Sequence, residues 1–320
     1  MATDACVSKK AGAMALTAVA AMSLTSIPAH ARPHRPPGRH PAVAALLRPD
    51  RPVRRRLPRG LSALAWTVAD ADTGRVLAAR NPHRQLAPAS TLKTLFAVTV
   101  LPKFSAGHVR QVSSADLDGL GTGSSVVGVR QGGRYRVSDL WYGVFLRSGN
   151  DAVHVLASMN GGWSATAREM QQTARRLGAH DTMVKSPDGY DAPGQVSSAY
   201  DLTVFARAGL ANADFARYCS TARARFPAAG GATTEIENTN RMLVGSHGLS
   251  RYPGIVGVKN GYTSKAGNTL IAAARRNGHT LIATVLNPQS GEVNGVYKEA
   301  GALLDWGFRN ADEAEPVNRS

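Results

Sequence analysis

The chain has 320 residues, of which 43% are hydrophobic, and this is enough apolar material for one large domain or two modest ones. Its formal charge of +16 is unevenly spread, because residues 32–60 contain nine arginines and a single acidic residue, Asp50. Residues 61–320 carry a net charge of only +7, which argues against a nucleic-acid-binding domain.

Residues 1–31 have the pattern of a signal peptide. Lys9-Lys10 precede small and apolar residues over 11–28, and Ala29-His30-Ala31 has the small-x-small form of a cleavage site. An uncleaved membrane anchor is the alternative, which the threonines and serines of the apolar stretch disfavour. No later segment approaches the length and apolarity of a membrane span, so we expect an exported, soluble protein.

Residues 32–60 contain seven prolines beside the nine arginines, a composition that predicts a disordered leader. This charge run could attract anionic wall or membrane polymers, but a solvated spacer is the simpler interpretation. Cysteine usage excludes a disulfide scaffold, because Cys6 leaves with the signal and Cys219 then has no partner. We therefore expect Cys219 to pack as a hydrophobic residue.

The structured part is predicted to start near Leu61 with a β-hairpin, in which 65–69 and 75–79 flank a turn rich in Asp and Gly. Helices are predicted at 90–101, 138–147, 151–158, 164–177 and 199–209, the last with Ser198 as N-cap and Asp201 three residues later. A short hairpin is predicted around 126–137, turning at Gly132-Gly133.

Strands return near the end of the chain, at 254–258, 269–275 and 280–285. Asn277-Gly278 is a strong signal for a two-residue hairpin turn between the last two, and an amphipathic helix follows at 296–308. Strands at both ends with helices between them predict an α+β fold: one antiparallel sheet built from both chain ends, flanked by helices, with a mainly helical middle lobe. A cleft between sheet and lobe is the expected ligand site.

Three short motifs carry possible chemistry. Ser90 and Lys93 lie one turn apart at the start of a predicted helix, where a lysine with a lowered pKa can act as the base for a serine nucleophile. Ser148-Gly149-Asn150 lies between two predicted helices, and Lys259-Asn260-Gly261 lies on a predicted strand. Each motif alone has a simpler interpretation, namely a capped helix, a helix-ending turn and a surface lysine.

The order Ser-x-x-Lys, Ser-x-Asn, Lys-Thr-Gly is typical of penicillin-binding proteins and class A β-lactamases. Over residues 61–310 the chain resembles the low-molecular-mass penicillin-binding proteins, and more narrowly the D-alanyl-D-alanine carboxypeptidases. The likeness extends to Ser124-Ser125, the run 194–201, and Asn238-Thr239-Asn240-Arg241. It implies a β-lactamase-like α+β fold and a peptidoglycan stem peptide as substrate, with β-lactams as covalent inhibitors.

The resemblance also implies roles for nine residues. Ser90 is the expected nucleophile, Lys93 its base, Ser148 the proton donor to the leaving amine, and Asn150 the residue that holds Lys93 or the substrate amide. Substrate binding falls to Lys259, Asn260, Gly261, Tyr262 and Thr263, and the backbone N–H groups of Ser90 and Tyr262 form the expected oxyanion hole.

Several departures from the family pattern bear on turnover. Asn260 stands where threonine is usual, and its amide can still donate to a carboxylate but is bulkier and planar. The arginine that many relatives carry after the last hairpin is absent from 287–297, so the substrate carboxylate must be bound by Lys259, Asn260 and Thr263, or by another arginine. Residues 311–320 form a polar tail, and neither a C-terminal β domain nor a membrane-lying terminal helix is evident.

Two alternatives to the carboxypeptidase remain open. A serine β-lactamase of the same fold is disfavoured because class A enzymes use a dedicated glutamate for deacylation, and residues 185–201 contain no glutamate. A peptidoglycan-binding protein that turns over slowly because of Asn260 is the second. No metal or other cofactor is expected, since only His30 and His34 have an i, i+4 spacing and they flank the predicted cleavage site.

Overall fold

A computed structural model of the chain describes residues 56–310. The predicted signal peptide, the polar tail at 311–320 and the leader up to residue 55 lie outside the described residues. Arg56–Gly60, the last leader residues, form no helix or strand apart from a turn at Arg59-Gly60.

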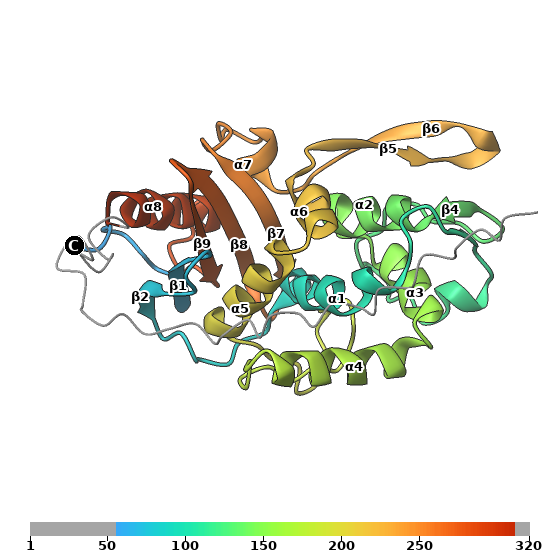
Figure 1. The fold of residues 1–320 in the computed structure, drawn as a ribbon, viewed down its shortest axis with the longest axis horizontal. Coiled ribbons are helices and arrows are strands. Elements are labelled where there is room, and N and C mark those ends of the chain that lie inside the picture. The colour runs from blue at the N-terminus through green and yellow to red at the C-terminus, as the bar shows by residue number, and fades with distance from the viewer. Residues whose placement is uncertain (1–55, 311–320) are drawn as a thin grey trace, which may run out of the picture. The chain divides into compact units, whose positions relative to one another are not determined.

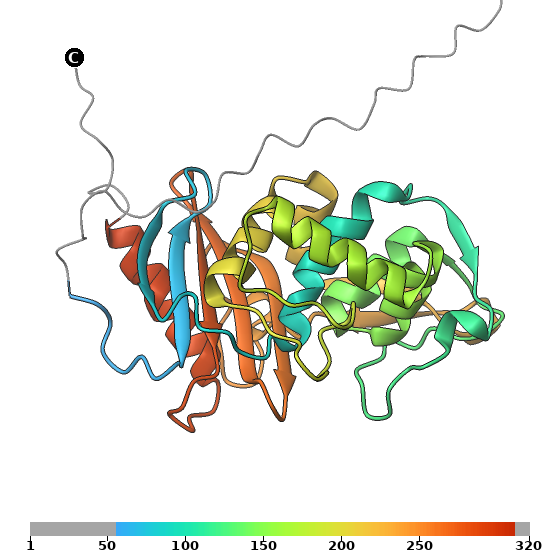
Figure 2. The ribbon, with the colours of Figure 1, turned by 90° about the horizontal axis from the view of Figure 1, so that it is seen from below.

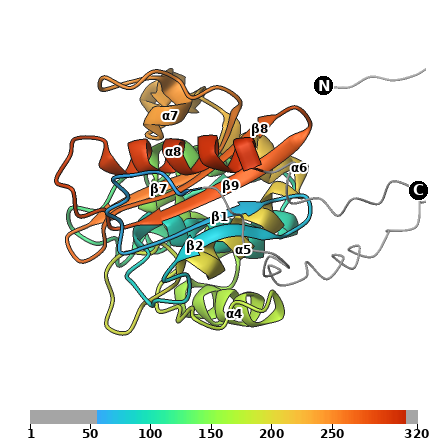
Figure 3. The same ribbon diagram turned by 90° about the vertical axis from the view of Figure 1, so that its left-hand side faces the viewer.

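One five-stranded antiparallel sheet is built from both ends of the described chain (Figures 1 and 3). Its order is β2 (Val76–Arg80), β1 (Ala65–Asp70), β9 (His279–Leu286), β8 (Gly267–Arg276) and β7 (Ile255–Thr263). The sheet therefore confirms the prediction that distant strands pair, with Trp66 opposite Val285 in the β1–β9 ladder. Strand β7 is an edge strand, which leaves its outer side open to a ligand.

Turn chemistry explains two of these pairings. In the β1–β2 turn, the Asp70 carboxylate accepts the N–H of Thr73 at 2.8 Å, and Gly74 adopts a φ of +79°. In the β8–β9 turn, Asn277 and Gly278 both have positive φ, as a type I′ turn requires. The Asn-Gly prediction is confirmed.

Helices cover both faces of the sheet (Figure 3). Helix α8 (Gly295–Asn310) packs on one face, and alternate β9 residues (Leu281, Ala283, Val285) join it in one apolar cluster. Ile282 and Leu286, whose side chains point to the other face of β9, belong to a second cluster formed with the helical lobe. This two-residue alternation is the expected signature of a strand buried on both faces.

The helical lobe contains α1 (Lys93–Val100), α2 (Val137–Arg147), α3 (Asn150–Met159), α4 (Trp163–Arg176), α5 (Ala199–Leu210) and α6 (Ala213–Ser220). The single turn α7 (Arg241–Val244) lies beside β7 instead, and its Met242 and Leu243 join the apolar cluster of α8 (Figure 1). Short 3₁₀ turns occur at Ala89–Leu92, Leu101–Lys103, Ala115–Leu117 and Ala229–Gly231. Helix α1 contacts α4, α5 and β7, so the helix that follows Ser90 lies at the centre of the fold (Figure 2). As predicted, Ser198 caps α5 by accepting the N–H of Asp201.

Some predicted elements were wrong or missing. The hairpin around 126–137 does not form; β4 (Arg134–Arg136) instead pairs with β3 (Val109–Gln111), and the Asp151 carboxylate binds the backbone N–H groups of 127–129. A second hairpin, β5 (Arg223–Pro227) with β6 (Thr233–Glu237), was not predicted and extends beside α2 (Figure 1). Cys219 is buried and free, as expected.

Candidate active site

Ser90 and Lys93 meet as their spacing predicts. Ser90 lies in the 3₁₀ turn Ala89–Leu92, and Lys93 is the first residue of α1. The Lys93 Nζ donates to Ser90 Oγ at 2.8 Å and to the backbone carbonyl of Asp188 at 2.7 Å. These two bonds direct the amine at the hydroxyl.

Burial makes the Lys93 amine a usable base. Its side chain is only 1% exposed, and this desolvation lowers its pKa to about 8, although the carboxylates of Asp188 and Asp151 oppose the change. Lys259 is equally buried, and burial together with the positive charge of Lys93 holds its pKa well below the usual value. The two lysines are therefore electrostatically linked.

Ser148 and Asn150 lie at the junction of α2 and α3. Ser148 ends α2 in the left-handed conformation, with φ of 57°, and Asn150 begins α3 with its N–H bonded to the carbonyl of Ser125 at 2.7 Å. Both side chains are buried, yet Ser148 Oγ and Asn150 Oδ1 have no hydrogen-bond partner among residues 56–310. Unpaired buried oxygens are costly, so each of these two atoms marks a place in the described chain that lacks a polar partner.

Strand β7 supplies the opposite wall of the site. Gly261 packs directly on the backbone of Ser90, since a Cβ at this position would lie 2.7 Å from the Ser90 N. The glycine therefore brings the following residue, Tyr262, close to Ser90. The Lys259 Nζ donates to the carbonyl of Asn260 at 2.8 Å, while the Tyr262 side chain is 66% exposed.

These walls enclose a polar cleft of about 690 Å³. Five of the nine residues singled out from the sequence line it: Ser90, Ser148, Asn260, Gly261 and Tyr262. Lys93, Asn150 and Lys259 are buried and do not line it. Thr263 does not line it either, because its hydroxyl donates to the Asp191 carboxylate at 2.8 Å and accepts the N–H of Ala266.

The cleft also holds residues to which sequence reasoning assigned no role. Arg241, at the start of α7, lines it, donates to Asn294 and lies over the Tyr297 ring at 5.8 Å. The Asn260 amide accepts from Thr239 Oγ1 at 3.0 Å, and its nitrogen lies 3.3 Å from the Tyr297 hydroxyl. Arg241 belongs to the 238–241 run noted above, which was the available signal for an arginine at this end of the cleft.

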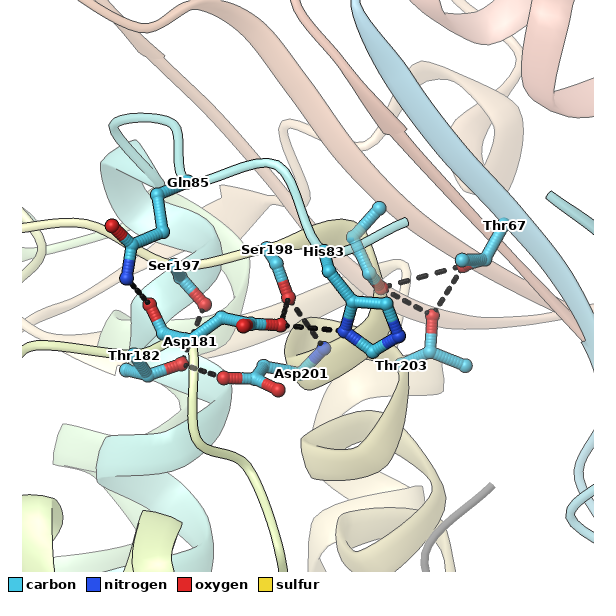
Figure 4. A network of polar contacts seen from close by, with 10 residues as sticks. Thr67, His83, Gln85, Asp181, Thr182, Ser197, Ser198, Asp201 and Thr203 are labelled. Carbon is cyan, nitrogen blue, oxygen red and sulfur yellow. Dashed lines mark hydrogen bonds and ion pairs between the residues drawn. The ribbon is translucent and has the colours of Figure 1, made fainter. Parts of the chain in front are cut away.

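The loop 180–197 holds the Asp188 carbonyl in place. Inside it, the buried Gln195 side chain accepts the N–H groups of Lys185 and Ser186 and donates to the carbonyl of Tyr190. At its base, Asp181 accepts from Ser198 at 2.9 Å and contacts His83 Nδ1 at 2.8 Å (Figure 4). His83 and Ser198 share one carboxylate oxygen, so this cluster fastens the loop to the chain before Ser90 and is not a hydrolytic triad.

The described part of the chain lacks two features, a metal-binding cluster and a membrane-spanning helix. Between residues 56 and 310, no three His, Cys, Asp or Glu side chains are grouped to hold a metal ion. Over the same range, no helix combines the length and apolarity needed to cross a bilayer.

Comparison with known proteins agrees with this geometry. Residues 53–290 match the peptidase S11 family, described as D-alanyl-D-alanine carboxypeptidase. The chain is 37% identical over 250 residues to the D-alanyl-D-alanine carboxypeptidase DacB2 of Mycobacterium tuberculosis, covering 77% of this chain and 82% of that protein.

Solved structures of similar proteins have the same fold. A crystal structure of a D-alanyl-D-alanine carboxypeptidase from Mycobacterium tuberculosis H37Rv superposes with a TM-score of 0.72 at 35% identity, covering 82% of this chain and 96% of the other. The Streptomyces K15 DD-transpeptidase superposes with a TM-score of 0.72 at 26% identity, covering 80% and 100%. The chain thus belongs to the peptidase S11 family of serine-type D-alanyl-D-alanine carboxypeptidases, with the α+β fold of the penicillin-binding proteins.

Proposed function

We propose that the protein is exported and removes the terminal D-alanine from peptidoglycan stem peptides through an acyl-serine intermediate. The observation that carries this proposal is the 2.8 Å contact between the buried Lys93 amine and Ser90 Oγ at the wall of the cleft. Export rests on the signal-like residues 1–31 and on the cell-wall substrate of the family.

In the proposed acylation, neutral Lys93 takes the Ser90 proton as Oγ attacks the carbonyl of the penultimate D-alanine. The backbone N–H groups of Ser90 and Tyr262 stabilise the oxyanion, a contribution of about 3–4 kcal/mol per donor in acyl-transfer enzymes. Ser148 relays to the leaving amine the proton that Lys93 took from Ser90, so D-alanine departs and Lys93 is neutral again. Water then attacks the ester, Lys93 takes its proton, and that proton passes to Ser90 Oγ as the ester bond breaks.

Recognition of the leaving carboxylate is assigned to the Asn260 end of the cleft. The Arg241 guanidinium supplies a positive charge at the cleft wall, and the buried Lys259 amine precedes Asn260 on β7. Asn260 then orders Thr239 and Tyr297 around the carboxylate. Thr263 supports the site from outside the cleft through its bond to Asp191.

The direct test is release of free D-alanine from a synthetic stem peptide ending in D-Ala-D-Ala, comparing wild type with Ser90→Ala. We expect release by the wild type only; absence of release by purified wild type contradicts the proposal. A fluorescent penicillin distinguishes the alternatives: a long-lived adduct on Ser90 fits the carboxypeptidase, rapid destruction of the drug fits a β-lactamase, and no adduct fits a binding protein.

A further inference from the structure

The cleft is larger at its Asn260 end than a terminal D-alanine requires. Besides the residues around Ser90, it is lined by Ser246 and His247, which follow α7, and by the segment 292–297. These two segments meet there, because the Asn294 side chain donates to the carbonyl of His247 at 2.9 Å. A volume of about 690 Å³ is in the range that holds drug-sized ligands, whereas alanine carries a single methyl group. The leaving position therefore has room for a longer side chain.

Arg147 brings an unpaired positive charge to this end of the cleft. It is the last residue of α2, and its exposed side chain lines the cleft. The carbonyl of Leu146, its neighbour, accepts the N–H of Thr239 at 2.9 Å, and Thr239 Oγ1 in turn donates to Asn260. Arg147 thus lies next to the residues that surround the leaving carboxylate. Its guanidinium makes no hydrogen bond or ion pair with any residue between 56 and 310.

The acidic side chains of the same cleft do not balance this charge. Glu237 accepts from Arg223 at 2.7 Å, and Glu292 accepts from Lys298 at 2.8 Å. Each carboxylate is therefore already neutralised by a basic partner outside the cleft. The charge that remains available to a ligand is the positive charge of Arg147.

We propose that the leaving position also accepts D-amino acids whose side chain ends in a carboxylate, and that Arg147 binds this second carboxylate. Arg241 is held by Asn294 and remains with the first, the α-carboxylate. A guanidinium binds a carboxylate through two parallel hydrogen bonds, and the long arginine side chain can move to meet it. The reaction is otherwise the same: the bond after the penultimate D-alanine is hydrolysed, and the acidic D-amino acid leaves with the relayed proton on its amine.

This subsite rests on the proposed function, and its test separates the two. Release of X is measured from three peptides, diacetyl-L-Lys-D-Ala-X, in which X is D-alanine, D-glutamate or D-glutamine. D-Glutamine matches D-glutamate in size and lacks its charge, so their ratio isolates the second carboxylate. We expect kcat/KM for the D-glutamate peptide to be about tenfold above that for the D-glutamine peptide at low salt. The ratio should fall in 0.5 M NaCl, because the cleft is open to solvent.

Arg147→Gln should reduce the D-glutamate-to-D-glutamine ratio to about one, and Arg147→Lys, which keeps the charge, should retain about threefold. Arg168→Gln is the matched control, because Arg168 is an exposed arginine of α4 that does not line the cleft. Thermal melting verifies that each variant is folded.

Three results would overturn this role of Arg147. These are equal rates for D-glutamate and D-glutamine in the wild type, a ratio that Arg147→Gln leaves unchanged, and an equal loss on all three peptides in Arg147→Gln. In each case, release of D-alanine by the wild type leaves the carboxypeptidase intact. Release from none of the peptides by the wild type refutes the proposed function, and the subsite with it.

Discussion

The pH dependence of Ser90 acylation follows from the buried position of Lys93. Acylation needs the neutral amine, and the pKa of Lys93 is lowered to about 8 by desolvation. The neutral fraction is then about 1% at pH 6, about 10% at pH 7 and about 90% at pH 9. The second-order rate of acylation should therefore rise about 90-fold between pH 6 and pH 9 and level off above it.

Stopped-flow fluorescence with a labelled penicillin measures this rate across the pH range. Lys93→Ala should slow acylation by about 10²–10⁴-fold and remove the rise centred near pH 8. Lys265→Ala serves as control, because Lys265 is an exposed lysine on the turn after β7 and should leave the profile as it is. A rate that stays flat from pH 6 to 9, or a Lys93→Ala profile of wild-type shape, refutes the assignment of Lys93 as the base.

Two further predictions concern substrate binding and the core. Asn260→Thr removes the amide that joins Thr239 to the Tyr297 hydroxyl. In assays of D-alanine release, KM for a D-Ala-D-Ala peptide should therefore rise about three- to tenfold, with a smaller change in kcat. An unchanged KM contradicts this role of Asn260. Phe145→Ala should lower the free energy of unfolding by about 3–5 kcal/mol in urea titrations, because this buried ring contacts Trp141, Phe215 and Tyr218. A loss below about 1 kcal/mol would show that the neighbouring rings move into the cavity left by the missing ring.

The β8–β9 hairpin and the Ser90–Lys93 contact were predictable because their signals are local. Asn277-Gly278 marks a hairpin, and the three-residue spacing of Ser90 and Lys93 places them on one face of a turn. The failure at 126–137 has a different origin. That segment is held by the Asp151 carboxylate, a tertiary contact that the local alternation of residues does not reveal.

The site likewise combines features that the sequence reveals with features that depend on tertiary contacts. The second acceptor of Lys93 is the backbone carbonyl of Asp188, and a backbone acceptor leaves no mark in the sequence. Thr263 was grouped with the substrate-binding residues through its motif, yet its hydroxyl is bonded to a loop 72 residues away. Arg241 had a signal in the 238–241 run, but only the three-dimensional arrangement puts its side chain in the cleft with Tyr297.

The unpaired edge of β7 is suited to binding a peptide, but it also creates a risk of aggregation. An unpaired strand edge that accepts an extended peptide can equally accept the edge of another molecule, which is a route to aggregation. Strand β7 has an irregularity in its register between Ile255 and Gly257, and such a break disrupts the ladder that a second strand would extend. This short irregular segment thus makes the exposed edge a poorer template for pairing with copies of the same strand.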